Sequence, residues 1–370
     1  MNAPRILAII PRVPPVTDGI GDYGLALASA LRRLSGIETE FVVGDPAWDG
    51  PAEVKGFAVR RVTSRSEREM LALLRRADGS DPSTLLLHYE GYGYANRGCP
   101  VWLVDALARW KNATARRRLV TIFHELYATG PLWTSSFWLS PLQRRLARRL
   151  VRLSDQRLTS LGLYAGIVQK LGNGIKAEAL SLPVFSSIGE PAATSPLCER
   201  SRRLVVFGTR GRRIEVYRRS AAELNRICRQ LGITEIIDIG RPIDFDIASV
   251  IDTPVVTCGE LAGAEVSRWM LDSMAGVIDY PARFLGKSTI FAAYCAHGII
   301  PIVASADAPL PAEGLEAGRH YWLTDESEAL DIDSGQLIAD NALAWYQAHN
   351  LSIHAENLAA CLGGIGSPIR

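Results

Sequence analysis

The chain has 370 residues, of which 48% are hydrophobic and 22% are charged. Single hydrophobic cores stop growing at about 250 to 300 residues, so we expect two domains. This composition is typical of a globular protein and excludes collagen, coiled coils and intrinsically disordered chains.

The net charge of +2 conceals an asymmetry between the two halves of the sequence. Residues 1–190 carry 25 Lys and Arg against 17 Asp and Glu, a net charge of +8, whereas residues 191–370 carry 16 against 22, a net charge of −6. A basic half suggests a polyanionic partner: phosphates, nucleic acid or an anionic membrane surface.

The longest apolar runs, such as Leu7 to Ile10, fall far short of the roughly 20 residues that cross a bilayer. The N-terminus also lacks the apolar region of a signal peptide, so we expect a cytoplasmic protein. The six cysteines are scattered, without a Cys-x-x-Cys pair or a histidine at metal-binding spacing. They predict buried, reduced thiols rather than a disulfide framework or a zinc site.

The first half alternates apolar runs with helical patterns. The strands are apolar throughout, which indicates a parallel sheet covered by helices on both faces. In chain order we predict strands at 5–10, 39–44, 84–89, 119–125, 156–161 and 179–185, and helices at about 23–34, 66–77 and 101–112.

The stretch Ser186 to Arg203 is rich in Ser, Pro, Ala and Gly, so it is the expected linker. The alternation then restarts, with strands at 203–209, 235–240, 253–259, 275–280 and 299–305, helices at about 220–231, 263–274 and 288–297, and a terminal helical segment near 341–362. The predicted fold class is α/β, with Rossmann-like domains at 1–188 and 202–340. We expect the helical segment at 341–370 to pack back toward the first domain.

Open parallel α/β sheets bind ligands at the carboxyl ends of their strands, so turns that follow strands are candidate sites. The first is "PPVTDGIGDYG", Pro14 to Gly24. Gly19 and Gly21 allow either a close approach of the backbone to a ligand or a positive φ, and the next helix offers N–H groups to an anion. The alternative is an ordinary turn with an Asp N-cap.

A second turn follows the strand in "LVTIFHE", where His124 stands at the carboxyl end. A histidine there could donate a hydrogen bond or move a proton. The alternative is a core or rim histidine without a chemical role.

The third turn is "FGTRGRRIEVYRRS", residues 207–220, which we expect to be a loop before a helix. Guanidinium groups bind phosphate oxygens bidentately, so its arginines form a plausible diphosphate clamp. The alternative is a solvated charge run. The arginines are Arg210, Arg212, Arg213, Arg218 and Arg219.

The fourth turn contains Gly286-Lys287-Ser288-Thr289. Pro281 stands where the leading glycine of a P-loop would be, which argues against a P-loop NTPase. Lys287 and Ser288 at a helix start still suit an anion, although Ser288 could serve only as a helix cap.

Aromatic side chains in loops after the first-half strands are candidates for acceptor binding, because rings suit the C–H faces of sugars and lipid chains. Buried loop anchors are the alternative. These side chains are His88, Tyr92, Tyr94, Trp133 and Trp138. A basic amphipathic helix at 142–157 could lie on an anionic bilayer, or could simply be solvated while its leucines pack on the sheet.

Together the four turns resemble those of retaining GT-B glycosyltransferases, especially the family 4 group. The resemblance rests on "PPVTDGIGDYGLALASALRR", "IFHE", the basic segment after the strand at 203–209, and "FAAYCAHGIIPIVAS". It implies two Rossmann-like domains facing a central cleft, and a nucleoside-diphosphate sugar as co-substrate without a further cofactor.

The resemblance also implies roles for individual residues. His124 would be the catalytic residue near the reacting sugar, and Asp22 and Tyr23 would face the acceptor. The donor diphosphate would contact Gly19, Gly21, Arg212 and Arg218, with Arg210 as an alternative to Arg212, and with Lys287 and Ser288 as further candidates.

One departure from the family pattern concerns two glutamates eight positions apart. The matching positions here hold Leu285 and Ala293. The donor sugar would then be held by other groups, or be atypical, or transfer has been lost.

The predicted function is therefore a hexosyltransferase-type glycosyltransferase of polysaccharide or glycoconjugate assembly, acting on a glycan, lipid-linked or small-molecule acceptor with retention of configuration. We expect no metal, since the Asp-x-Asp at Asp244 to Asp246 follows a loop-like Arg-Pro-Ile. We expect cytoplasmic location, also at the inner face of the membrane, and no nucleic-acid partner. The rival hypothesis is a non-catalytic protein that binds a nucleotide sugar or a glycan.

Overall fold

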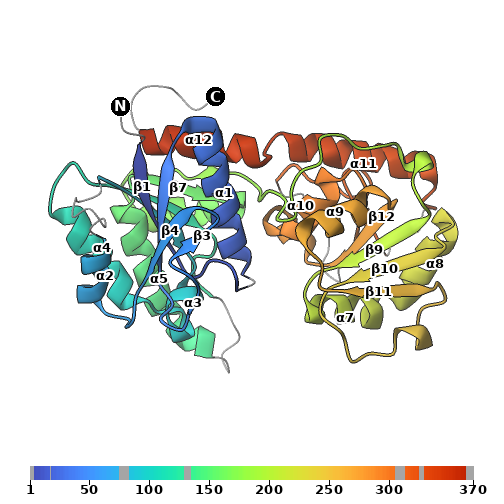
Figure 1. The fold of residues 1–370 in the computed structure, drawn as a ribbon, viewed down its shortest axis with the longest axis horizontal. Coiled ribbons are helices and arrows are strands. Elements are labelled where there is room, and N and C mark those ends of the chain that lie inside the picture. The colour runs from blue at the N-terminus through green and yellow to red at the C-terminus, as the bar shows by residue number, and fades with distance from the viewer. Residues whose placement is uncertain are drawn as a thin grey trace. The chain divides into compact units, whose positions relative to one another are not determined.

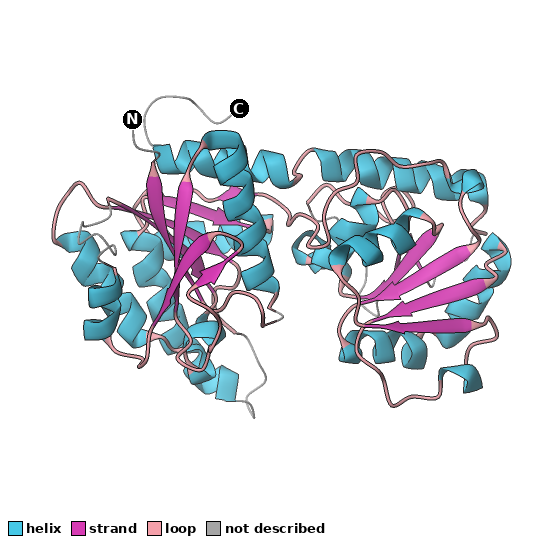
Figure 2. Ribbon diagram, in the orientation of Figure 1, coloured by secondary structure: helices cyan, strands magenta, loops and turns pink. Residues whose placement is uncertain are grey.

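The computed structural model describes residues 4–16, 18–74, 83–128, 135–304, 313–324 and 329–363, with the side chains of 135–137 left out. The chain divides into two compact units. Unit 1 contains Met1–Leu182 and Leu351–Arg370, and unit 2 contains Pro183–Asn350. Each unit has its own sheet with helices packed on it (Figure 1 and Figure 2).

Unit 1 is built on an eight-stranded sheet of order β3-β4-β2-β1-β5-β6-β7-β8, parallel except for the β3–β4 pair. Its strands are β1 (Arg5–Ile10), β2 (Glu38–Val43), β3 (Glu53–Val54), β4 (Phe57–Arg61), β5 (Thr84–Tyr89), β6 (Arg118–Phe123), β7 (Gln156–Thr159) and β8 (Leu180–Ser181). Its helices are α1 (Gly19–Ser35), α2 (Glu67–Leu73), α3 (Gly91–Tyr94), the 3₁₀ turn η1 (Asn96–Gly98), α4 (Val101–Asn112), α5 (Ser135–Leu153), α6 (Gly162–Gly172) and α12 (Leu351–Gly363).

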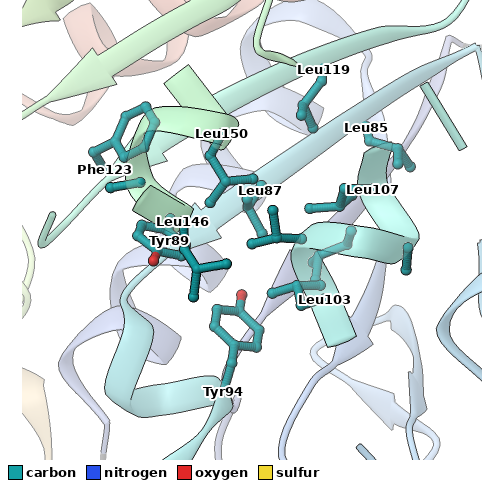
Figure 3. Packing of buried hydrophobic residues seen from close by; sticks show 14 of the residues in the cluster. Leu85, Leu87, Tyr89, Tyr94, Leu103, Leu107, Leu119, Phe123, Leu146 and Leu150 are labelled. Atoms are coloured by element: carbon teal, nitrogen blue, oxygen red, sulfur yellow. The ribbon is translucent and has the colours of Figure 1, made fainter. Parts of the chain in front are cut away.

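The two faces of the unit 1 sheet are covered by different helices. Successive side chains of a strand point to opposite faces. Leu85, Leu87 and Tyr89 of β5 join a core with leucines of α4 and α5, as Figure 3 shows. His88, between Leu87 and Tyr89, therefore points to the other face, where α1 lies and α12 packs against α1 (Figure 1).

Unit 2 is built on a six-stranded parallel sheet of order β11-β10-β9-β12-β13-β14. Its strands are β9 (Arg203–Phe207), β10 (Glu235–Ile239), β11 (Val255–Gly259), β12 (Ala275–Asp279), β13 (Ile300–Ala304) and β14 (Trp322–Leu323). Its helices are α7 (Arg210–Arg219), α8 (Ala221–Leu231), α9 (Gly263–Leu271), α10 (Thr289–Ala296) and α11 (Ile332–Gln347), with the 3₁₀ turns η2 (Leu197–Glu199), η3 (Ile247–Ser249) and η4 (Ala282–Lys287).

Both sheets contain a topological switch point. The chain leaves β1 for β2 on one side and later places β5 on the other side of β1; in unit 2, β9 lies in the same way between β10 and β12. Ligands of open α/β sheets bind at the carboxyl ends of the strands that flank such a point. The exits of β1 and β5 in unit 1, and of β9 and β12 in unit 2, are therefore the positions of interest.

The predicted strands are present, but two predictions about helices are wrong. The segment at 210–219, predicted to be a loop, is α7; its polar sequence has too few apolar residues to show a helical period. The predicted terminal helical segment near 341–362 consists of two helices, α11 and α12. The basic helix predicted at 142–157 ends at Leu153, because Gln156 already pairs with Val120 in the sheet.

The stretch predicted to be a linker, Ser186 to Arg203, is anchored to unit 2. Arg200 is buried, and its guanidinium donates hydrogen bonds to the carbonyl oxygens of Ser195, Ser273 and His297. The backbone N–H of Ser186 donates to the Tyr346 hydroxyl at 3.0 Å. Composition alone suggested a loose connection, but these bonds hold the stretch in a defined position.

Candidate functional site

The β1–α1 turn is a capped helix start. Asp18 is the N-cap of α1, and its carboxylate accepts hydrogen bonds from the backbone N–H groups of Ile20 and Gly21, both at 2.9 Å. These are donors that a phosphate would otherwise meet. The Asp N-cap, which was the alternative to an anion-binding turn, is thus present. Contact of Gly19 and Gly21 with a diphosphate stays a prediction.

Gly19 and Gly21 differ in how much room their surroundings leave for a side chain. Neither has a positive φ, since both lie in the first turn of α1. A Cβ at Gly21 would lie 2.8 Å from the carbonyl oxygen of Arg12, whereas a Cβ at Gly19 would meet nothing within 4 Å. Position 21 therefore requires glycine, because two backbone segments approach closely there. At Gly19 the surroundings leave room for a side chain.

Ion pairs organise the carboxyl edge of the unit 1 sheet. The guanidinium of Arg12 donates to the buried Asp45 at 2.7 Å and lies 3.5 Å from the Asp18 carboxylate. The hydrogen bond to Asp45 raises the pKa of Arg12. Burial, followed by the charge of Asp18, raises the pKa of Asp22. Asp22 is thus a half-buried carboxyl with an increased affinity for a proton at the edge where a ligand is expected.

His124 and His88 form a bonded pair behind the same edge. His124 follows β6 and is half-buried, and its Nε2 lies 3.1 Å from Nδ1 of His88. His88 is 1% exposed, and burial lowers its pKa to about 3, so its ring is neutral. An acceptor cannot reach a side chain buried to this extent, so the prediction that His88 contacts the acceptor does not fit the structure.

Tyr23 is also buried, which likewise conflicts with direct acceptor contact. Its ring meets that of His124 edge-on, with centroids 5.2 Å apart, and its hydroxyl lies 3.1 Å from Nδ1 of His354. His354 belongs to α12 and lies in none of the four candidate turns. No local pattern could have identified it, because the contact joins residues 331 positions apart.

The exit of β9 in unit 2 leads directly into α7. Gly208 has a φ of 140°, a conformation that favours glycine. A Cβ there would lie 2.7 Å from Cδ1 of Ile290, so this turn lies against the first turn of α10. Thr209 is the N-cap of α7 and makes no side-chain capping bond. The start of α7 thus presents a helix N-terminus beside the start of α10.

Arg212 lies beside the end of β12. Its Nη1 donates to the carbonyl oxygen of Asp279 at 3.4 Å, and its guanidinium lies 5.0 Å from the ring centroid of Tyr280. Arg219, two turns later on the same helix face, lies 4.0 Å from the Asp279 carboxylate. Burial raises the pKa of Asp279, while Arg219 and Arg212 oppose that rise. These arginines flank the switch point of unit 2.

The predicted pair of Arg212 and Arg218 does not converge. Residues six positions apart on a helix point about 120° from each other. Arg218 stacks instead over Phe245, in the segment between β10 and β11, with 5.4 Å from its guanidinium to the ring centroid. Arg210 is engaged by the exposed Asp244. The two arginines therefore lie on different faces of α7 and do not face one another as the predicted clamp requires.

Arg213 has a structural role. It is 1% exposed and forms an ion pair with the fully buried Asp238, which also accepts a hydrogen bond from Tyr217 at 2.8 Å. The guanidinium further donates to the carbonyl oxygens of Gly208 and Arg241. Arg213 thereby links the segments that follow β9 and β10, and its guanidinium stabilises the fold rather than binding a ligand.

Ser288 precedes α10, is buried and accepts a hydrogen bond from the Phe291 N–H at 3.2 Å. It is therefore the N-cap of α10, which was the alternative to a role in anion binding. Lys287 ends η4, immediately before that cap. Leu285 and Ala293, at the positions of the two expected glutamates, are fully buried in the core of unit 2. They have no polar atom to offer a sugar.

The remaining acceptor candidates differ in accessibility. Tyr92 is exposed, and its hydroxyl accepts a hydrogen bond from Gln143 at 3.3 Å. The Tyr94 hydroxyl is buried and donates to the carbonyl oxygen of His88. Trp133 lies outside the described residues. On α5, Trp138 is 73% exposed.

Within the described ranges, no cluster of three or more His, Cys, Asp or Glu side chains is arranged to hold a metal ion. Over the same ranges, no helix combines the length and the apolar character that crossing a membrane requires.

No protein-family model and no curated protein matches the sequence. Solved structures do match over nearly the whole chain. An α,α-trehalose 6-phosphate synthase from Burkholderia multivorans aligns with a TM-score of 0.60 at 12% identity, covering 100% of both chains. A UDP-N-acetylglucosamine 2-epimerase aligns with a TM-score of 0.55 at 12% identity, covering 97% of this chain and 95% of the other.

An α-glucosyltransferase in complex with UDP-glucose and DNA aligns with a TM-score of 0.59 at 10% identity, covering 98% of this chain and 100% of the other. At these identities the similarity shows the fold alone. The chain has the GT-B fold, with two Rossmann-like units, and shares it with glycosyltransferases and with an epimerase.

Proposed function

We propose that this protein is a glycosyltransferase that moves a sugar from a nucleoside-diphosphate-sugar donor to a glycan, lipid-linked or small-molecule acceptor with retention of configuration. The observation that carries the proposal is the switch point of unit 2, where α7 begins and Arg212 lies beside the end of β12. The GT-B fold supports it, since an α-glucosyltransferase in complex with UDP-glucose and a UDP-N-acetylglucosamine 2-epimerase share this scaffold.

The donor diphosphate would bind at the start of α7. The positive end of a helix dipole and the guanidinium of Arg212 both favour phosphate oxygens at this position. Lys287, at the end of η4, would add charge, and Ser288, the N-cap of α10, would donate its hydroxyl hydrogen while its oxygen caps the helix. Arg210 would have to exchange Asp244 for the ligand, and Arg218 would bind only a group that extends toward Phe245.

Catalysis would consist mainly of stabilising the departing diphosphate. Preorganised cations and helix ends act on the charge that develops as the bond between the sugar and the phosphate breaks. His124 would contact the reacting sugar, with Gly19 and Gly21 in the same edge of unit 1. Asp22, whose pKa is raised by burial, would accept a hydrogen bond or a proton from the acceptor.

The acceptor would lie against unit 1, where Tyr92 offers an exposed ring and Trp133 is a further candidate. The solvent-facing side of α5 suits an anionic membrane surface that carries a lipid-linked acceptor. It combines Trp138 with the exposed Arg144, Arg145 and Arg148. Arginines and an aromatic ring on one helix face are typical of interfacial helices. The enzyme would then act in the cytoplasm or at the inner face of the membrane.

A second candidate function is a binding protein for nucleotide sugars or glycans that has lost turnover. Leu285 and Ala293 favour it, because they are buried apolar residues at positions where the resembling family carries glutamates. Such a protein would retain the arginines of α7 and bind a donor without consuming it.

Incubation with a panel of nucleotide sugars, followed by product analysis with and without candidate acceptors, separates the candidates. Transfer to an acceptor supports the proposed enzyme. Binding of a donor that is neither transferred nor hydrolysed supports the binding protein. Conversion of the donor to an epimer, without any acceptor, would assign the scaffold to a different reaction. If no nucleotide sugar, nucleoside diphosphate or glycan raises the melting temperature, both candidates fail.

A further inference from the structure

Four ring side chains of unit 1, three buried and one half-buried, form one cluster behind the edge of the sheet. Two hydrogen bonds pair them: His88 with His124, and Tyr23 with His354. The ring of Tyr23 meets both rings of the first pair edge-on, with centroids 6.1 Å from His88 and 5.2 Å from His124. The two pairs are therefore held against each other.

The position of the His88 ring is determined from several sides. A Cβ at Gly24 would lie 3.6 Å from Cε1 and Nε2 of His88, so α1 packs closely on that edge of the ring. The Tyr94 hydroxyl donates to the His88 carbonyl oxygen at 2.7 Å, which holds its backbone. The rings of His88 and His124 are nearly parallel, with 12° between their planes. This packing directs Nδ1 of His88 at Nε2 of His124.

We propose that His88 is a positioning residue that determines which ring nitrogen of His124 meets a ligand, with Tyr23 and His354 holding the pair in place. Since Nε2 of His124 is bonded to His88, a ligand that bonds to this ring must meet Nδ1. The kinetic part of the inference rests on the proposed function, whereas the arrangement of the pair does not.

The proton balance of the pair follows from its geometry. If His124 gains a proton at Nδ1, both of its nitrogens carry hydrogen, and Nε2–H must donate to Nδ1 of His88. His88 then carries its own hydrogen at Nε2 and is neutral. Burial opposes a charge on His88, whose pKa is about 3, so the proton stays on His124. His88 thus accepts a hydrogen bond without receiving the proton.

The test is ¹⁵N NMR of the histidine rings, which reports the tautomer of His124 without any turnover. The amide of asparagine lies close to the Nδ1 position of histidine, and that of glutamine close to Nε2. We therefore expect His88→Asn to keep the hydrogen-bonded Nε2 signal of His124, and His88→Gln to lose it. The Tyr23→Phe variant keeps the ring contacts and removes the bond to His354; we expect a broadened or mixed His124 signal.

Turnover measured on the same variants should follow the NMR signal. His88→Gln should lower kcat about tenfold, corresponding to one lost hydrogen bond, while His88→Asn should recover most of that loss and KM for the donor should hardly change. Identical His124 spectra in the Asn and Gln variants would overturn the inference. If the wild-type protein binds a donor without turnover, the NMR comparison still decides on His88, and only the proposed function fails.

Discussion

The carbonyl oxygen of Arg12 occupies the space that a side chain at Gly21 would need, 2.8 Å from the position of its Cβ. Both partners belong to backbone segments, so neither can rotate away. We predict that Gly21→Ala lowers the free energy of unfolding by about 1 to 3 kcal/mol, as overpacking typically does. Urea unfolding measures this difference.

Gly19 is the matched control, because it lies in the same helix turn and a Cβ there meets nothing within 4 Å. Gly19→Ala should leave stability unchanged or raise it by up to about 1 kcal/mol, since alanine reduces the entropy of the unfolded chain. Equal losses in the two variants would show that the contact with Arg12 is not what requires Gly21.

A second prediction concerns donor binding by α7. Arg212→Ala should weaken the binding of nucleoside diphosphates by about 1.5 to 3 kcal/mol, the contribution of a charge-assisted hydrogen bond. Arg218→Ala should weaken it less, because Arg218 stacks over Phe245 on another face of the helix. Isothermal titration calorimetry gives both affinities.

Arg229→Ala on α8 controls for the general loss of positive charge, since Arg229 is exposed and paired with Asp252. Unchanged affinity in the Arg212 variant would remove the start of α7 from the donor site.

The burial of His88 predicts a dependence of stability on pH. Its pKa is about 3 in the folded chain, against an ordinary value of about 6.5 in the unfolded chain. Between these values the unfolded state binds more protons, so stability is complete above pH 6.5 and decreases as the pH falls. His88 alone should cost about 2 kcal/mol between pH 7 and pH 5.

Urea unfolding of the wild type and of His88→Asn at both pH values measures that cost, because asparagine does not titrate. The variant should lose less stability on acidification. The same loss in both proteins would mean that His88 is protonated in the folded state.

His124→Ala should reduce turnover by about a hundredfold or more while leaving donor affinity almost unchanged, if His124 contacts the reacting sugar. Steady-state kinetics and nucleotide binding separate the two effects. His124→Gln serves as a second variant that preserves a polar side chain. If the variants lose folding and show no separate loss of turnover, His124 is instead a core histidine without a chemical role.

The exposed face of α5 predicts binding to anionic vesicles. Arg145→Glu with Arg148→Glu should reduce sedimentation with phosphatidylglycerol-containing vesicles, since each basic residue near such a surface contributes about 1 kcal/mol. Reversal of Arg229 and Arg268, two exposed arginines of unit 2, gives an equal change of charge elsewhere. Equal effects of the two double variants would argue against a dedicated membrane face.

Sequence patterns predicted the sheets better than the site. The apolar runs at 5–10 and 84–89 coincide with β1 and β5, because a strand buried on both faces must be apolar along its length. The helix at 210–219 was not predicted, because its buried side chains include Arg213, whose charge is balanced by Asp238 of strand β10. From the sequence alone, a buried charge whose partner is far away along the chain cannot be distinguished from a solvated charge.

Local periodicity was sufficient to predict the α/β class and the two sheets, and the rule that parallel sheets bind ligands at their carboxyl edges pointed to the strand ends. Which side chains meet at those strand ends depends on how the whole chain folds. Folding brings His354 to Tyr23 across 331 positions and buries His88 behind His124. These outcomes depend on the packing of helices on the sheets, and no local pattern in the chain encodes them.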